Sequence, residues 1–147
     1  MVKSMDSYLK VGVVGLGRLG SLYAEYLAYQ IPRSSVIAIT DADTERAEKI
    51  GDELNIENVF SDYRDMLELD NLDAIVITTP TSTHKKMVID ASEKGKMIFC
   101  EKPLSISLED AADMKEVVKK NGSFFHMGFM RRFDPGYAAA KEKIKNG

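Results

Sequence analysis

Three glycines near the amino terminus place the strongest constraint on the fold of this chain. Gly15, Gly17 and Gly20 stand in the stretch LKVGVVGLGRLGSLY, directly after an apolar run and at the start of a segment with helical spacing. Glycine-rich turns also occur for steric reasons that involve no ligand. The motif by itself therefore leaves two interpretations open, a bare strand-to-helix turn and a loop that binds a nucleotide.

The rest of the chain alternates apolar runs with amphipathic segments, which is the pattern of parallel strands joined by helical crossovers. Strands are expected at 9–14, 36–40, 59–60, 74–79, 97–100 and 124–127. Several runs, such as AIVIT, are continuously apolar, as is typical of strands that are covered on both faces. The sequence thus predicts an α/β fold, a doubly wound Rossmann-type parallel sheet with helices on both faces.

Three apolar faces follow the i, i+3, i+4 spacing of a helix. They are formed by Leu19, Leu22, Tyr23, Tyr26 and Leu27; by His84, Val88 and Ala91; and by Leu108, Ala111, Met114, Val117 and Val118. Ser107, followed three residues later by Asp110, predicts the start of the third helix, because a serine there can cap the free amides of the first turn. A turn at 134–136 and a lysine-rich helix at 137–146 are expected after the last strand.

Composition limits the class of protein. The chain has 147 residues, the size of one domain, and its net charge of -3 disfavours a nucleic-acid partner. Its single cysteine, Cys100, excludes an intramolecular disulfide and is interpreted as a small buried hydrophobe in a reducing compartment. With two scattered histidines, no metal site is expected. The absence of a long apolar run or a signal peptide predicts a cytoplasmic protein without a membrane partner.

The context of the glycines favours the nucleotide-binding interpretation. The pattern GxGxxG directly after a strand and at the start of a helix is the dinucleotide fingerprint. Gly15 is expected to allow the tight turn, Gly17 the approach of a pyrophosphate, and Gly20 the close packing of helix and strand. The loop residues Leu16, Arg18 and Leu19 would then present main-chain amides to the phosphates, aided by the helix dipole.

Asp41 provides an independent test of that interpretation. It follows the second expected strand, VIAIT, about 20 residues after Gly20, where dinucleotide sites carry an acid that binds the ribose hydroxyls. The alternative is an ordinary surface aspartate. A carboxylate here repels the additional phosphate of NADP, and Ala42 offers no adjacent guanidinium, so the expected cofactor is NAD. Arg46, one helical turn later, keeps NADP as the less favoured alternative.

A second group of polar residues lies in FCEKPLS, at 99–105 and at the end of the fifth expected strand. Ligands in open α/β sheets bind beyond the carboxyl ends of the strands, so Glu101 and Lys102 are expected at the cofactor cleft. Pro103 favours an extended backbone at Lys102. The alternative is a surface ion pair, but the strand-end position and the proline favour a functional site.

Together, these motifs resemble the Gfo/Idh/MocA oxidoreductases. The resemblance rests on the glycine turn, Asp41, TTPTSTH at 78–84, EKP at 101–103 and GFMRRFDPGY at 128–137, in this order and spacing. It covers the chain from about Leu9 onward and is strongest to the inositol 2-dehydrogenase branch. It implies a dinucleotide-binding domain at 9–130, and a linking segment and helix at 131–147 that lead towards a C-terminal substrate domain. A second methionine, Met5, independently suggests a leader at 1–8.

The resemblance also implies a reaction. NAD would oxidise a ring hydroxyl of an inositol or sugar-like polyol to a ketone, with Lys102 as the catalytic lysine that helps the proton to leave. Glu101 would bind the nicotinamide ribose. Further cofactor contacts would come from Thr79, Pro80, His84, Met130 and Arg131. For His84 a packed or capping histidine is the alternative, and for Arg131 a solvated pair with Arg132.

Members of this family continue for about twice this length or more, into a second domain that supplies substrate contacts. The chain is therefore expected to bind NAD but to turn over substrate poorly or not at all alone, and its full-length form is expected to be a homo-oligomer. A non-catalytic NAD(P)-binding sensor or regulatory module is the alternative. A methyltransferase with a similar glycine turn is disfavoured because it gives no account of the EKP run.

Overall fold

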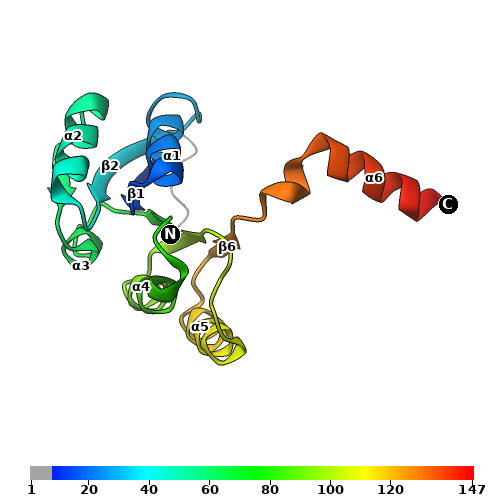
Figure 1. The fold of residues 1–147 in the computed structure, drawn as a ribbon. Coiled ribbons are helices and arrows are strands. Elements are labelled where there is room, and N and C mark those ends of the chain that lie inside the picture. Colours follow the sequence, from blue (N-terminus) through cyan, green and yellow to red (C-terminus); the bar gives the residue numbers. More distant parts are fainter. Residues whose placement is uncertain (1–7) are drawn as a thin grey trace.

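The computed structural model describes residues 8–147, so the expected leader at 1–8 lies, except for Tyr8, outside the described residues. The chain alternates strands and helices along its length (Figure 1). The elements are β1 (Leu9–Val14), α1 (Arg18–Tyr29), β2 (Ser34–Thr40), α2 (Thr44–Leu54), β3 (Asn58–Phe60), α3 (Tyr63–Leu67), β4 (Ala74–Ile77), α4 (Thr81–Glu93), β5 (Met97–Cys100), α5 (Leu108–Asn121), β6 (Phe125–Met127), the 3-10 helix η1 (Met130–Phe133) and α6 (Pro135–Asn146).

The six strands form one parallel sheet in the order β3-β2-β1-β4-β5-β6. This is the strand order of the doubly wound dinucleotide-binding fold, so the predicted fold class is confirmed. From β1 the chain first builds outward through β2 and β3, then returns and adds β4 on the other side. The carboxyl ends of β1 and β4 therefore flank the point where the winding reverses, which is where ligands bind in such sheets.

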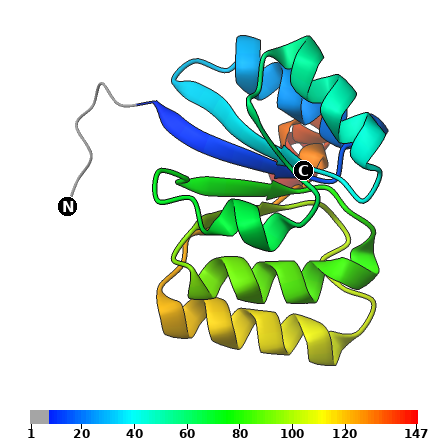
Figure 2. The same cartoon turned by 90° about the vertical axis from the view of Figure 1, so that its left-hand side faces the viewer.

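Helices cover the sheet on opposite sides, with α1 and α2 on one face and α4 and α5 on the other (Figure 2). Neighbouring strand residues therefore point into different cores: Val13 packs with the α1 and α2 side, and Val14 with the α4 and α5 side. Ile75 and Val76 alternate in the same way. Burial on both faces is the reason that the strand sequences are continuously apolar.

The expected elements are present with shifted ends, and two predicted apolar faces are wrong in part. On α5, Leu108 is 91% exposed. Strand β4 ends at Ile77 instead of residue 79. On α1, the predicted apolar face is wrong in part, because Leu19, Leu22 and Tyr26 are 45%, 40% and 43% exposed. The residues that α1 buries are small, Gly20 and Ala24. At these two positions the close approach of the helix leaves no room for a long side chain, whereas Tyr23 and Leu27 pack partly buried against the same core.

The predicted start of α5 is confirmed, and the expected turn at 134–136 is corrected. The Ser107 side chain accepts a hydrogen bond from the Asp110 amide at the start of α5. The expected turn at 134–136 is instead the first turn of α6, where the Asp134 side chain accepts hydrogen bonds from the amides of Gly136 and Tyr137. Pro135 suits the first helical position because its missing N–H needs no partner there.

Helix α6 extends away from the sheet and has no buried residue (Figure 1). It contacts η1, which precedes it. None of the helices within residues 8–147 combines the length and the apolar character that crossing a membrane requires.

Cys100 ends β5 with its side chain fully buried. Burial, with a smaller contribution from the Glu101 carboxylate, raises the pKa of its thiol to about 12. Because only the thiolate reacts with alkylating agents, we expect native Cys100 to react with iodoacetamide at pH 8 at least about 100-fold more slowly than the unfolded chain. As the chain has one cysteine, a single rate reports on it. Equal rates in buffer and in denaturant would contradict this burial.

Candidate functional site: a dinucleotide cleft at the carboxyl ends of the strands

The three glycines of the loop after β1 meet different surroundings. Gly15 has a φ of 85°, which favours glycine, and a Cβ there would lie 2.7 Å from the Thr79 Cγ2 atom. A Cβ on Gly20 would lie 1.8 Å from the carbonyl oxygen of Gly15, so the helix could not approach the loop. At Gly17, no atom lies within 4 Å of an added Cβ. Two glycines are therefore required by packing, and the third leaves open space.

Helix α1 begins beside that open space without a side-chain cap. Its N-cap residue is Gly17, which offers no side-chain oxygen, and the first turn holds no acidic residue. The first amides of a helix lack partners within the helix and carry the positive end of its dipole. The start of α1 is consequently suited to bind an anion that approaches over Gly17.

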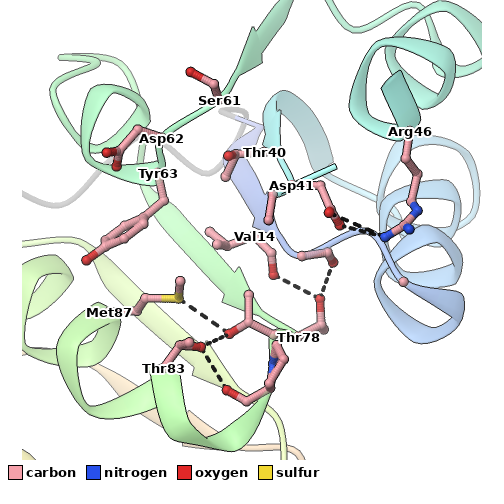
Figure 3. Close-up of a pocket in the computed structure, with 15 residues that line it drawn as sticks. Val14, Thr40, Asp41, Arg46, Ser61, Asp62, Tyr63, Thr78, Thr83 and Met87 are labelled. Carbon is pink, nitrogen blue, oxygen red and sulfur yellow. Dashed lines mark hydrogen bonds and ion pairs between the residues drawn. The ribbon is translucent and has the colours of Figure 1, made fainter. Parts of the chain in front are cut away.

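Asp41, the first residue after β2, is held against this loop. Its carboxylate accepts hydrogen bonds from the amides of Leu16 and Asp43, and its side chain is 9% exposed. The Arg46 guanidinium, from the first turn of α2, lies 3.3 Å from Oδ1 of the same carboxylate. Arg46 also pairs with Asp43 at 2.8 Å. The predicted ribose-binding acid thus stands beside the glycine loop, as Figure 3 shows for Asp41 and Arg46.

Thr78 binds the glycine loop on the side opposite Asp41. The sequence analysis did not predict this contact. Its Oγ1 donates to the carbonyl oxygen of Gly15 at 2.6 Å and lies 3.0 Å from that of Val14 (Figure 3). Its own amide donates to Val14. The signal in the sequence was TTP directly after an apolar strand, in which only the second threonine was assigned a role.

Between these residues lies a cleft of about 820 Å³ over the carboxyl ends of β1, β2 and β4. Its walls come from the glycine loop, the ends of the strands, the first turns of α2 and α3 and the first two turns of α4 (Figure 3). The lining residues are Val14, Gly15, Gly17, Thr40, Asp41, Ala42, Arg46, Ser61, Asp62, Tyr63, Thr78, Thr79, Pro80, Thr83 and Met87. Leu16 and Arg18 lie on the other side of Gly17, in an adjoining hollow with Arg46 and Lys49.

Glu101 and Lys102 follow β5 with contrasting environments. Glu101 is 6% exposed, and its carboxylate accepts hydrogen bonds from the Tyr23 hydroxyl at 2.7 Å and the Lys102 amide at 3.0 Å. The Lys102 side chain is exposed. The two residues are therefore not a surface ion pair, since Glu101 is turned inward against α1. Neither is among the residues that line the cleft.

His84, in the first turns of α4, is fully packed. Its side chain is 1% exposed, its Nε2 lies 2.9 Å from the carbonyl oxygen of Thr79, and its Nδ1 lies 3.0 Å from that of Pro103. Each ring nitrogen thus faces a backbone carbonyl oxygen, and the tautomer decides which of the two nitrogens donates. We interpret His84 as the packed histidine of the two alternatives, which joins the loop after β4 to the loop after β5.

The structure does not bring every predicted residue to the cleft. Met130 and Arg131 lie in η1, beyond β6, and the Arg131 guanidinium stacks on the Tyr137 ring at 4.7 Å. Leu19 is 45% exposed on α1. By contrast, Thr83, Met87 and Tyr63 line the cleft without having been predicted, because nothing in their local sequence marks them.

The residues present fit a dinucleotide. Open space over Gly17 lies at the uncapped start of α1, and the Asp41 carboxylate stands at the end of the neighbouring strand. This arrangement, on the strand order described above, defines a Rossmann-type dinucleotide-binding domain. The chain belongs to the Gfo/Idh/MocA family, described as the oxidoreductase family with an NAD-binding Rossmann fold, whose model matches residues 9–129.

Relatives and solved structures agree with that assignment. The chain is 45% identical over 143 residues to scyllo-inositol 2-dehydrogenase (NAD(+)) of Bacillus subtilis, covering 97% of this chain and 42% of that protein. It is 37% identical over 139 residues to myo-inositol 2-dehydrogenase of Thermotoga maritima, covering 95% and 41%.

Among solved structures, scyllo-inositol dehydrogenase of Lactobacillus casei with bound cofactor NAD(H) and scyllo-inositol superposes with a TM-score of 0.91 at 34% identity, covering 96% of this chain and 42% of that chain. The chain thus spans less than half the length of these relatives.

Proposed function

We propose that this chain is the cofactor-binding domain of an NAD-dependent oxidoreductase that acts on an inositol or a similar polyol. The single observation that carries the proposal is the placement of Asp41 beside the glycine loop, with open space over Gly17 at the uncapped start of α1. The polyol substrate is suggested by the inositol dehydrogenases to which the chain is similar.

In this proposal, the two halves of the cleft hold different parts of NAD. The amides of the loop at 15–20 bind the pyrophosphate, and Asp41 binds the hydroxyls of the adenosine ribose. The ribose would take the place of the Arg46 contact, which at 3.3 to 3.4 Å is longer than the 2.8 Å contact from the Asp43 amide. Thr79 and Pro80, at the other wall, would contact the cofactor further along.

The residues after β5 would carry the chemistry. Bound NAD+ supplies the hydride acceptor: the substrate carbon loses a hydride, the hydroxyl loses a proton, and the alcohol becomes a ketone. Lys102 is proposed as the catalytic lysine that contacts the reacting hydroxyl and helps its proton to leave. Its exposed side chain at the carboxyl end of β5 is free to meet a substrate. Glu101 would bind the nicotinamide ribose through the remaining lone pairs of its carboxylate.

The second candidate is a non-catalytic NAD(P)-binding sensor or regulatory module. It is favoured by one observation, that Glu101 and Lys102 lie outside the lining of the cleft that contains Asp41 and the glycine loop. The two candidates differ in an assay of NADH formation from NAD+ with scyllo- or myo-inositol. We expect this chain alone to remain near background, and the same domain joined to a family substrate domain to be active. A joined protein that binds NAD but forms no NADH would favour the sensor.

Titration calorimetry tests the proposed cofactor directly. We expect saturable one-to-one binding of NAD+ by the 147-residue chain, with ADP binding more weakly because it makes only the adenosine and phosphate contacts. Circular dichroism establishes that the titrated chain is folded. A folded chain that gives no heat with NAD+, NADH or ADP would overturn the proposal.

A further inference from the structure

Tyr23 connects α1 to the residues after β5. Its hydroxyl donates a hydrogen bond of 2.7 Å to the Glu101 Oε1 atom, across 78 positions in the sequence. Its ring packs edge-on against the ring of Phe99, which lies in β5 two positions before Glu101, with ring centroids 5.4 Å apart. Packing of the ring against Phe99 therefore orients the Tyr23 hydroxyl towards Glu101.

Gly128 closes the other side of the same carboxylate. A Cβ on Gly128 would lie 2.6 Å from Oε1 and 2.8 Å from Cδ of Glu101, distances that real Cβ contacts do not show. Its amide donates to the Cys100 carbonyl oxygen at 2.9 Å, which holds the residue after β6 next to β5. The absence of a side chain at Gly128 thus makes room for Glu101.

From these contacts, we propose that Tyr23 and Gly128 are positioning residues for Glu101 and, through its bond to the Lys102 amide, for Lys102. Tyr23 fixes one carboxylate oxygen, the Lys102 amide fixes the other, and Gly128 leaves room for the carboxylate beside the residue after β6. The inference rests on the proposed function, in which Glu101 binds the nicotinamide ribose.

The chemistry of Tyr23 suits this role. Burial and the hydrogen bond to Glu101 raise the pKa of the Tyr23 hydroxyl, so it remains a donor throughout the neutral range. A hydrogen bond from a neutral donor to a carboxylate is among the stronger bonds in proteins. A nearly buried carboxylate that lost this partner would turn towards another donor or towards water. Either movement would displace the group that receives the nicotinamide ribose.

Comparison of NAD+ with ADP separates positioning from general damage. Tyr23→Phe keeps the ring against Phe99 and removes only the hydroxyl. We expect it to weaken NAD+ binding by about tenfold and ADP binding by less than about twofold, because ADP lacks the nicotinamide half. Tyr26→Phe is the matched control, since Tyr26 lies on the same helix, 43% exposed, and we expect it to change neither affinity.

A double-mutant cycle identifies Glu101 as the intermediary. If Tyr23 acts through Glu101, then the double variant Tyr23→Phe, Glu101→Gln binds NAD+ no more weakly than Glu101→Gln alone. Gly128→Ala should likewise weaken NAD+ binding more than ADP binding, because the added methyl group would contact the Glu101 carboxylate. The inference would be overturned if Tyr23→Phe weakened NAD+ and ADP binding equally, if it left the NAD+ affinity unchanged, or if the effects of the two substitutions in the cycle were additive. Absence of ADP and NAD+ binding by the unmodified chain would instead overturn the proposed function.

Discussion

Replacing Gly20 by alanine is expected to lower the free energy of unfolding by at least about 3 kcal/mol, or the melting temperature by about 10 °C. The added Cβ would lie 1.8 Å from the Gly15 carbonyl oxygen. That oxygen is held in place because it also accepts a hydrogen bond of 2.6 Å from the Thr78 hydroxyl. Relief requires α1 to move away from β1, which opens the core beneath the helix. Thermal unfolding followed by circular dichroism measures the loss.

Gly17→Ala provides the matched comparison within the same motif. Gly17 has a φ of -64°, which any residue can adopt, and its added Cβ meets no atom within 4 Å. We expect a stability change below about 1 kcal/mol but at least about tenfold weaker NAD+ binding, because the methyl group occupies the approach of the pyrophosphate. Equal destabilisation by both substitutions would show that the open space over Gly17 has been misassigned.

Asp41→Asn is expected to shift the preference between NAD+ and NADP+ by about 100-fold towards NADP+. The amide oxygen can still accept the Leu16 amide that Asp41 now binds, so the loop keeps its anchor. The negative charge that repels the additional phosphate is lost, and Arg46 loses its carboxylate partner in the cleft. Titrations of both cofactors with the original and substituted chains measure the shift.

Two further variants distinguish the role of Asp41 from that of its surroundings. Asp43 also pairs with Arg46 but does not line the cleft, and Asp43→Asn keeps a good helix cap, so we expect no change in preference. Adding Arg46→Ala to Asp41→Asn should remove the gain in NADP+ affinity. An NAD+ preference that survives Asp41→Asn would refute the role given to this carboxylate.

The fold was predictable because its signals are local and repeated. Continuous apolar runs such as AIVIT predict strands with two buried faces, and the amphipathic segments between them predict the crossovers. The glycine motif and Asp41 were also recognisable, since each has a fixed position relative to a strand end. Where a local pattern had no packing information, as with Leu19 and Leu22 on α1, the predicted face was wrong in part.

The fold class, the family and the positions of the residues that follow each strand could be predicted from the sequence, because these depend on periodicity and on short motifs. What those side chains contact depends on the tertiary structure. It buried Glu101 against Tyr23, packed His84 between two loops and attached Thr78 to the glycine turn. These partners lie on different strands and helices, and hydrogen bonds across such separations leave no periodic trace in a single sequence.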